Sequence, residues 1–407
     1  MTVKIGSTLG PGLVAAASDN DPTTITTLIV VGASSVYSLT WVVLLLYPML
    51  AGVLLIAGQV GLVSRSGLLL NVRRLYGRRW ALLLLLSVLS VNLITLAADL
   101  EAGAASLGLI SGIDLRWFVV PYAGLLLALL LFGSYRGIQR ALKYSMALFA
   151  AYVFAAFLAH PDWGAVVRAT AFPAVSLQPD RIEAALAILG TTLTSYCYVW
   201  EVQQEAEERR PRNRMAHVRL DAGVGMLIAV VTFWFIIVAS GATLGIHRLP
   251  AGTAADAAAA LRPLAGPLAS QLFAAGLLAS SLIAVPVLAA SGAYLLAEAR
   301  DWTSGLDRRA GQAPQCYRAM AVAIVVGAAT SLLGLPPIQL LYWASIAGGI
   351  GTPVGLVLLL LVAADERAMG RGPVSRSMLA AAWATTGLIT AVGVFFIGQQ
   401  IVRLVTL

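Results

Sequence analysis

Charged residues are scarce in this chain: Asp, Glu, Lys and Arg together make up 11% of its 407 residues, whereas 59% are hydrophobic and the mean hydropathy is +0.86. This balance excludes an ordinary soluble domain, which carries about 25% charged residues. Apolar stretches of membrane-spanning length recur instead, and they are continuous rather than alternating. The composition therefore predicts an all-α membrane protein.

Cysteine and histidine are nearly absent. The two cysteines, Cys197 and Cys316, are too few and too badly placed for a disulfide framework. The three histidines lie at predicted loops or span ends, so no imidazole is expected inside the membrane to relay protons near neutral pH. The sequence also lacks zinc-spaced His clusters, nucleophile elbows and phosphate-binding loops. These absences argue against an enzyme and against a bound cofactor.

The apolar stretches predict about eleven transmembrane helices. Ten or twelve remain open, because a turn as short as 334–337 separates two of the spans. The predicted spans are 8–36, 39–63, 80–110, 117–134, 138–159, 182–200, 221–244, 267–299, 319–334, 337–363 and 377–403.

Most of the 27 Lys and Arg residues fall in alternate loops between these spans. Because basic residues collect on the cytoplasmic side of short loops, this alternation predicts a cytoplasmic N-terminus and an extracytoplasmic C-terminus, in the inner membrane of a bacterium. The net charge of +8 is thus a signal of topology. No nucleic-acid partner is expected, since the arginines are not interleaved with aromatic residues.

Acidic residues, by contrast, do fall inside predicted spans. Burying a carboxylate in the bilayer costs about 3 kcal/mol, so such groups usually mark a pathway or a site. No Lys or Arg lies deep in a span to neutralise them, which makes a cation their natural partner. For Asp99 and Glu101 an equal alternative is pairing with helix termini or with Ser and Thr donors. The acidic residues in question are Asp19, Asp21, Asp99 and Glu101.

Pro22 predicts a break in the first span. Proline removes a backbone donor and disfavours helix at the residue before it. Unwound backbone at membrane depth is tolerated where it lines a cavity, and its carbonyls then become oxygen ligands. Ser18, Asp21 and Thr24 follow one another at three-residue spacing around the break. A plain proline kink is the alternative.

A second break is expected in the sixth span, where the stretch GTTLTS at 190–195 has low helix propensity and many hydroxyls. Paired broken helices are typical of transporters built from inverted repeats. We therefore expect a five-helix repeat over 1–160, a second over 181–363 and an additional C-terminal helix at 377–403.

These motifs resemble the Nramp family of divalent metal transporters. The likeness rests on Gly10-Pro11-Gly12, Asp21-Pro22, Ala98-Asp99-Leu100, the sixth span, and LLASSLIAVPVLAASGAYLLAE in the eighth. It implies a LeuT-like fold with an ion site between the broken first and sixth helices.

The chain also departs from the family pattern. Where classical members carry Asp-Pro-Gly-Asn, this chain has Asp21-Pro22-Thr23-Thr24, and Met-Pro-His is replaced by Thr194-Ser195-Tyr196. The thioether and the imidazole are thereby lost. The GTT stretch of the sixth span, followed by the acidic stretch WEVQQEAEERR, resembles the Nramp-related magnesium transporters, although the proline expected at Ser195 is missing. The resemblance implies a metal site made of Asp21, Thr24, Ser18, Thr191 and Thr194. Secondary or pathway residues are Asp19, Asn20, Ser195, Tyr196, Cys197, Asp99 and Glu101.

Oxygen ligands suit hard ions, so the sequence predicts transport of hard divalent cations such as Mg²⁺ and Mn²⁺. We expect a monomer that works by alternating access. Because no imidazole is expected in the pathway, we also expect a uniporter without proton coupling. Its partners are then the metal-ion substrate and the lipid bilayer. The alternative is a carrier of an amino acid or another organic solute that has lost metal binding. Cys197 would favour softer metals if its thiolate faced the site, but a small cysteine packed between helices is commoner.

Overall fold

The computed structural model describes residues 19–132, 150–207, 215–306, 308, 310–370, 372 and 374–406. All regular elements in these ranges are helices, and no strand occurs among them. The expected all-α fold is confirmed. Ser18, residues 8–18 of the first predicted span and much of the fifth span lie outside the described residues.

Most predicted spans coincide with one helix each. Seven helical stretches in the described part of the chain are long and apolar enough to cross a membrane, and α6 is a shorter apolar helix. The full count of eleven stays a prediction. The helices that match single spans are α3 (Thr40–Ser64), α5 (Arg78–Ser111), α6 (Arg116–Phe132), α11 (Met215–Ser240), α14 (Ala269–Arg300), α15 (Pro314–Ser331), α16 (Pro337–Ala364) and α18 (Arg376–Thr406).

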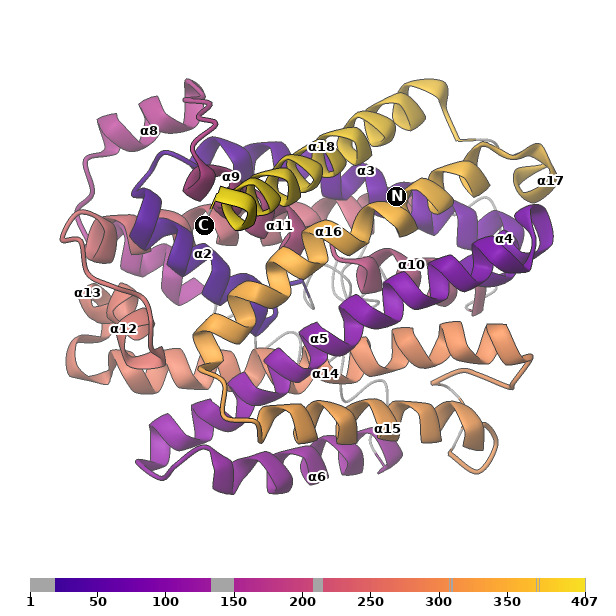
Figure 1. Ribbon diagram of the computed structural model, residues 1–407, viewed down its shortest axis with the longest axis horizontal. Helices are drawn as coiled ribbons and strands as arrows, with labels where there is room; N and C mark the ends of the chain where they lie inside the picture. The colour runs from indigo at the N-terminus through magenta and orange to yellow at the C-terminus, as the bar shows by residue number, and fades with distance from the viewer. Residues whose placement is uncertain are drawn as a thin grey trace, which may run out of the picture.

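Short helices occupy the two ends of the molecule (Figure 1). One end holds α8 (Trp163–Ala171), α12 (Ala254–Ala258) and α13 (Arg262–Ala265), and the other holds α4 (Leu68–Tyr76) and α17 (Glu366–Met369). Between them, α5 and α16 cross the centre, while α14, α15 and α6 run side by side along the long axis.

The first span is broken where predicted. Helix α2 (Pro22–Ser35) begins at the proline, and Asp21 is its N-cap, with an extended backbone at φ −74° and ψ 166°. The Thr24 N–H donates to Asp21 Oδ1 at 2.7 Å, which satisfies one of the donors that a helix start leaves open. Asp19 and Asn20 precede it without helical structure. Asp21 thus lies at a buried helix start.

The sixth span is also broken. Helix α9 (Pro179–Thr192) ends inside the hydroxyl-rich stretch, Leu193 and Thr194 are not helical, and α10 (Ser195–Glu207) begins immediately afterwards. The second predicted break is therefore confirmed, although no proline is present to cause it.

Close packing against α16 fixes the end of α9. A Cβ atom added at Gly190 would lie 2.1 Å from the Ser345 carbonyl oxygen and 2.2 Å from the Gly349 nitrogen. Both are backbone atoms, so neither can rotate away. The absence of a side chain at Gly190 lets α9 approach α16 at the turn before the break.

We expect Gly190→Ala to lower thermal stability, because overpacking of this kind costs roughly 1–3 kcal/mol. Gly52→Ala in α3 is the matched control, since a Cβ there would meet nothing within 4 Å. Both changes gain about 1 kcal/mol of helix propensity, so their difference isolates the clash. Thermal unfolding of the two variants in detergent measures it, and equal midpoints would contradict the packing argument.

Candidate functional site

Asp21 joins the two broken spans. Its side chain is buried at 0% exposure, and while Oδ1 caps α2, Oδ2 accepts a hydrogen bond from the Tyr196 hydroxyl at 3.2 Å. Tyr196 belongs to the first turn of α10. The carboxylate therefore lies where the start of α2 meets the start of α10.

Thr24 connects α2 with the end of α9. Its Oγ1 lies 2.9 Å from Thr191 Oγ1, and it also donates to the Thr191 carbonyl at 3.3 Å. Both threonines are fully buried. Since Thr24 also donates its N–H to Asp21, the structure brings Asp21, Thr24 and Thr191 together in one group.

Helix ends add to the field around this group. Thr191 lies in the last turn of α9, where carbonyl groups lack partners within the helix and the helix dipole is negative. A carboxylate, two hydroxyls and a carbonyl thus gather at one buried point. Such a set of oxygen atoms has the chemistry of a site for a hard cation.

Of the other predicted ligands, Thr194 makes its contacts outside this group. The Thr194 hydroxyl lies 3.5 Å from Cys197 Sγ, and in the described ranges none of its hydrogen bonds reaches Asp21, Thr24 or Thr191. Ser18 precedes the described residues. Among the described residues no group of three or more His, Cys, Asp or Glu side chains could hold a metal ion, so a cation here would need hydroxyl and carbonyl ligands.

Asp99 caps α2 from the side of α5. Its Oδ1 accepts the Thr23 hydroxyl at 2.6 Å and the Thr23 N–H at 3.1 Å, while Oδ2 has no hydrogen-bond partner among the described residues. For Asp99 the structure thus shows the alternative raised from the sequence, which is pairing with a helix terminus and a threonine. Glu101 is also buried, but neither of its carboxylate oxygens contacts a donor in the described ranges, and no hydrogen bond joins it to the breaks.

The remaining secondary residues line the unwound segments. Cys197 Sγ lies 3.6 Å from Asp19 Oδ1, and the Asn20 carbonyl accepts a hydrogen bond from the Ser280 hydroxyl. The Ser195 hydroxyl donates to Asn92 Oδ1 at 3.4 Å. The two breaks are therefore held by side chains from α5 and α14 as well as by each other.

Sequence reasoning missed several residues that support the site. Thr23 binds Asp99, Ser281 donates to the Asp99 carbonyl at 2.6 Å, and Tyr122 donates to Ser281 at 2.9 Å. The available signal was their polarity inside apolar spans. Only their contacts, which depend on how α2, α5, α6 and α14 are rotated, distinguish them from serines and threonines that bond within their own helix.

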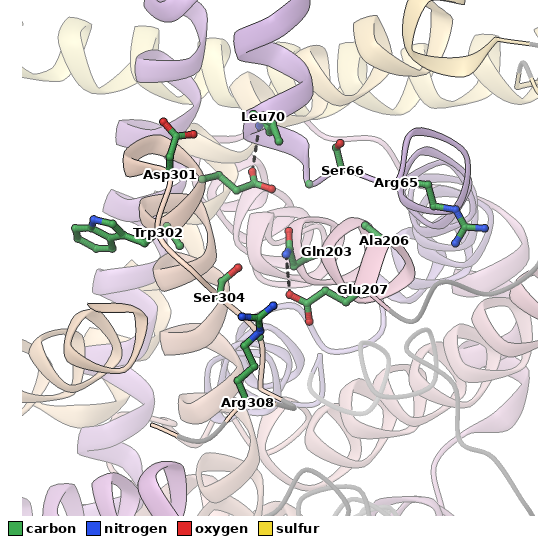
Figure 2. A pocket seen from close by; sticks show the side chains of 14 residues that line it. Arg65, Ser66, Leu70, Gln203, Ala206, Glu207, Asp301, Trp302, Ser304 and Arg308 are labelled. Carbon is green, nitrogen blue, oxygen red and sulfur yellow. Dashed lines mark hydrogen bonds between the residues drawn. The ribbon is translucent and has the colours of Figure 1, made fainter. Parts of the chain in front are cut away.

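A cavity of about 950 Å³ lies at the far end of α10 (Figure 2). Gln203 and Glu207 of α10 face it and are joined at 2.9 Å, and Glu298 of α14 accepts the Leu70 N–H at 3.1 Å. Arg65 and Arg308 also line the cavity. Helix α10 thus runs from the Asp21 group to a polar, charged cavity.

Outside the membrane-spanning segments, Arg73 binds the end of α14. It forms an ion pair with Asp301 at 2.7 Å and donates to the Glu298 carbonyl at 3.2 Å. The hydrogen bond between them lowers the pKa of Asp301 and raises the pKa of Arg73. This exposed contact ties α4 to α14 beside the cavity.

Apolar helices with two broken spans meeting at a buried carboxylate define an integral membrane protein with the LeuT-like transporter fold. A solved structure of a mutant of the Eremococcus coleocola manganese transporter is similar at a TM-score of 0.77 and 18% identity, covering 98% of this chain and 90% of that one. MhsT in complex with L-phenylalanine is similar at a TM-score of 0.65 and 14% identity, covering 96% and 98%. At these identities the similarity shows the fold alone.

Residues 12–399 match the family model described as natural resistance-associated macrophage protein-like, and the chain belongs to this Nramp family. The divalent metal cation transporter MntH of Deinococcus radiodurans is 27% identical over 96% of this chain and 89% of its own length. The MntH of Yersinia enterocolitica is 28% identical over 67% of this chain and 68% of its own. The family resemblance inferred from the motifs is confirmed.

Proposed function

We propose that this protein carries hard divalent cations, Mg²⁺ or Mn²⁺, across the membrane by alternating access, with Asp21, Thr24 and Thr191 as the centre of the binding site. The observation that carries the proposal is the convergence of the Asp21 carboxylate with the Thr24–Thr191 pair at the two helix breaks. Relatives named as divalent metal cation transporters support it. We propose Ser18, the other ligand predicted around the first break, as a further member of this set, whereas the Thr194 hydroxyl faces Cys197 instead.

A site made only of oxygen atoms favours hard cations. Mg²⁺ sheds water reluctantly and is commonly held by one or two carboxylates together with retained waters, which a site with a single carboxylate suits. The thioether and imidazole that would favour softer metals are replaced here by Thr194 and Tyr196. Tyr196 in turn holds the Asp21 carboxylate through its hydroxyl.

The cavity of Figure 2 is the proposed inner end of the route. Its walls include three acidic residues, Glu207, Glu298 and Asp301, and negative charge there attracts cations. Arg65 and Arg308 also line the cavity. The predicted orientation places this cavity on the cytoplasmic side, since the loops around it carry many arginines. Rearrangement at the broken helices would then open the buried Asp21 site toward it.

Calorimetric titration of the purified protein with Mg²⁺, Mn²⁺ and Ca²⁺ tests the proposal. We expect saturable heat with Mg²⁺ or Mn²⁺. No heat with any divalent ion, together with a thermal shift on adding amino acids, would instead support a carrier of organic solutes on the same scaffold.

Thr191→Val is expected to raise the dissociation constant for Mn²⁺ about tenfold, equal to about 1.4 kcal/mol, because it removes a hydroxyl without changing side-chain shape. Thr192→Val is the matched control, since the neighbouring Thr192 hydroxyl donates to the Ile188 carbonyl within its own helix at 2.7 Å. Calorimetric titration of both variants with Mn²⁺ measures the two dissociation constants. Equal losses of affinity, or no loss in either variant, would remove the Thr191 hydroxyl from the ligand set.

A further inference from the structure

A second cluster lies beside the Asp21 group, on the same turn of α10. Cys197 follows Tyr196, and its Sγ lies 3.6 Å from Asp19 Oδ1 and 3.5 Å from Thr194 Oγ1. Asp19 has 0% and Cys197 4% of its surface exposed. A carboxylate, a thiol and a hydroxyl thus meet in a buried position at the junction of the two breaks.

Asp19 is incompletely satisfied there. Its Oδ2 is buried and has no hydrogen-bond partner among the described residues, and Oδ1 has only the weak thiol donor. None of the ion pairs found in the described ranges involves Asp19. A buried carboxylate without a strong donor or a base is costly, so a bound cation would relieve it.

The spacing of the sulfur and oxygen atoms fits two ligands of one metal ion. Ligand bonds of about 2.3 Å to sulfur and 2.1 Å to oxygen, at a tetrahedral angle, place the two ligand atoms about 3.6 Å apart. Cys197 Sγ and Asp19 Oδ1 are separated by that distance, and Thr194 Oγ1 lies at nearly the same distance from the sulfur.

We propose that Asp19, Cys197 and Thr194 form a second cation position beside the Asp21 site, which takes thiophilic divalent ions of the Zn²⁺ and Cd²⁺ class. On binding, the Cys197 S–H bond breaks, the proton is released to solvent, and the sulfur binds the metal as a thiolate. The Asp21 group offers only oxygen atoms, so the two positions select different ions. The proposal rests on the proposed function, because the ion must reach this buried position by the same route.

Titration of the purified protein with Cd²⁺, followed by the ultraviolet thiolate-to-metal charge-transfer band, tests the second position. We expect a saturable band in the wild-type protein that disappears in Cys197→Ser. Cys316→Ser is the matched control: Cys316 is the other cysteine and is also buried, but it lies in α15. The control should keep the full band. A band that survives Cys197→Ser, or that Cys316→Ser removes, would overturn the proposal.

Asp19→Asn provides an independent arm that keeps the thiol. We expect the band to persist with a Cd²⁺ dissociation constant raised at least tenfold, and an unchanged constant would contradict the role of Asp19. This arm also serves if Cys197→Ser does not fold. Mn²⁺ influx separates the two proposals: influx that depends on Asp21, with no Cd²⁺ band in the wild type, would defeat the second position alone. A band without any Mn²⁺ influx would defeat the proposed function alone.

Discussion

Asp21→Asn is expected to reduce Mn²⁺ influx into proteoliposomes at least 100-fold. Asparagine caps helices as well as aspartate does, and its carbonyl oxygen can still accept the Thr24 N–H, so the start of α2 should persist. What the change removes is the negative charge, the only one in the proposed Asp21, Thr24 and Thr191 group. A 100-fold loss equals about 2.7 kcal/mol, a modest requirement for the sole charged ligand of a divalent ion.

Asp114→Asn is the control for this experiment. Asp114 is exposed after α5, where its carboxylate accepts the Arg116 N–H at 2.9 Å, so it has the same local role without burial. Mn²⁺ influx in the Asp114→Asn variant should equal that of the wild type. If Asp21→Asn folds with an unchanged unfolding midpoint and still carries Mn²⁺ at the wild-type rate, the ion does not bind at Asp21.

The breaks in the two spans were predictable because local sequence determines them. Pro22 cannot continue a helix from the residues before it, and α2 does begin there. The hydroxyl-rich stretch at 190–195 disfavours helix, and α9 ends within it. The family resemblance was equally accessible, since it rests on motifs read directly from the chain.

The partners of the site residues were less predictable, because they depend on the rotation and depth of helices far apart in sequence. Asp99 and Thr23 are 76 positions apart, and their hydrogen bonds follow from how α5 packs against α2. Thr194 was expected to join Thr191, but the turn between α9 and α10 directs its hydroxyl toward Cys197. Composition alone gives no access to such differences of orientation.

The sequence predicts transport without proton coupling, so accumulation of the ion should follow the membrane potential and not the pH gradient. An interior-negative potential of 100 mV supplies about 2.3 kcal/mol per elementary charge, hence about 4.6 kcal/mol for a divalent ion, and equilibrium accumulation would reach roughly 2,000-fold. His160 and His247 are exposed, and neither imidazole lies at the broken helices.

Proteoliposomes loaded with a pH dye and a metal dye, and polarised by a potassium gradient with valinomycin, measure both quantities at once. We expect Mn²⁺ influx to rise with the imposed potential while internal pH stays constant, and Asp21→Asn to abolish the metal signal in the same vesicles. Internal acidification in step with Mn²⁺ influx would show proton coupling. In that case Asp99, whose Oδ2 has no donor among the described residues, would be the first carboxylate to replace, because Asp99→Asn keeps an acceptor for Thr23 and removes a group that can carry a proton.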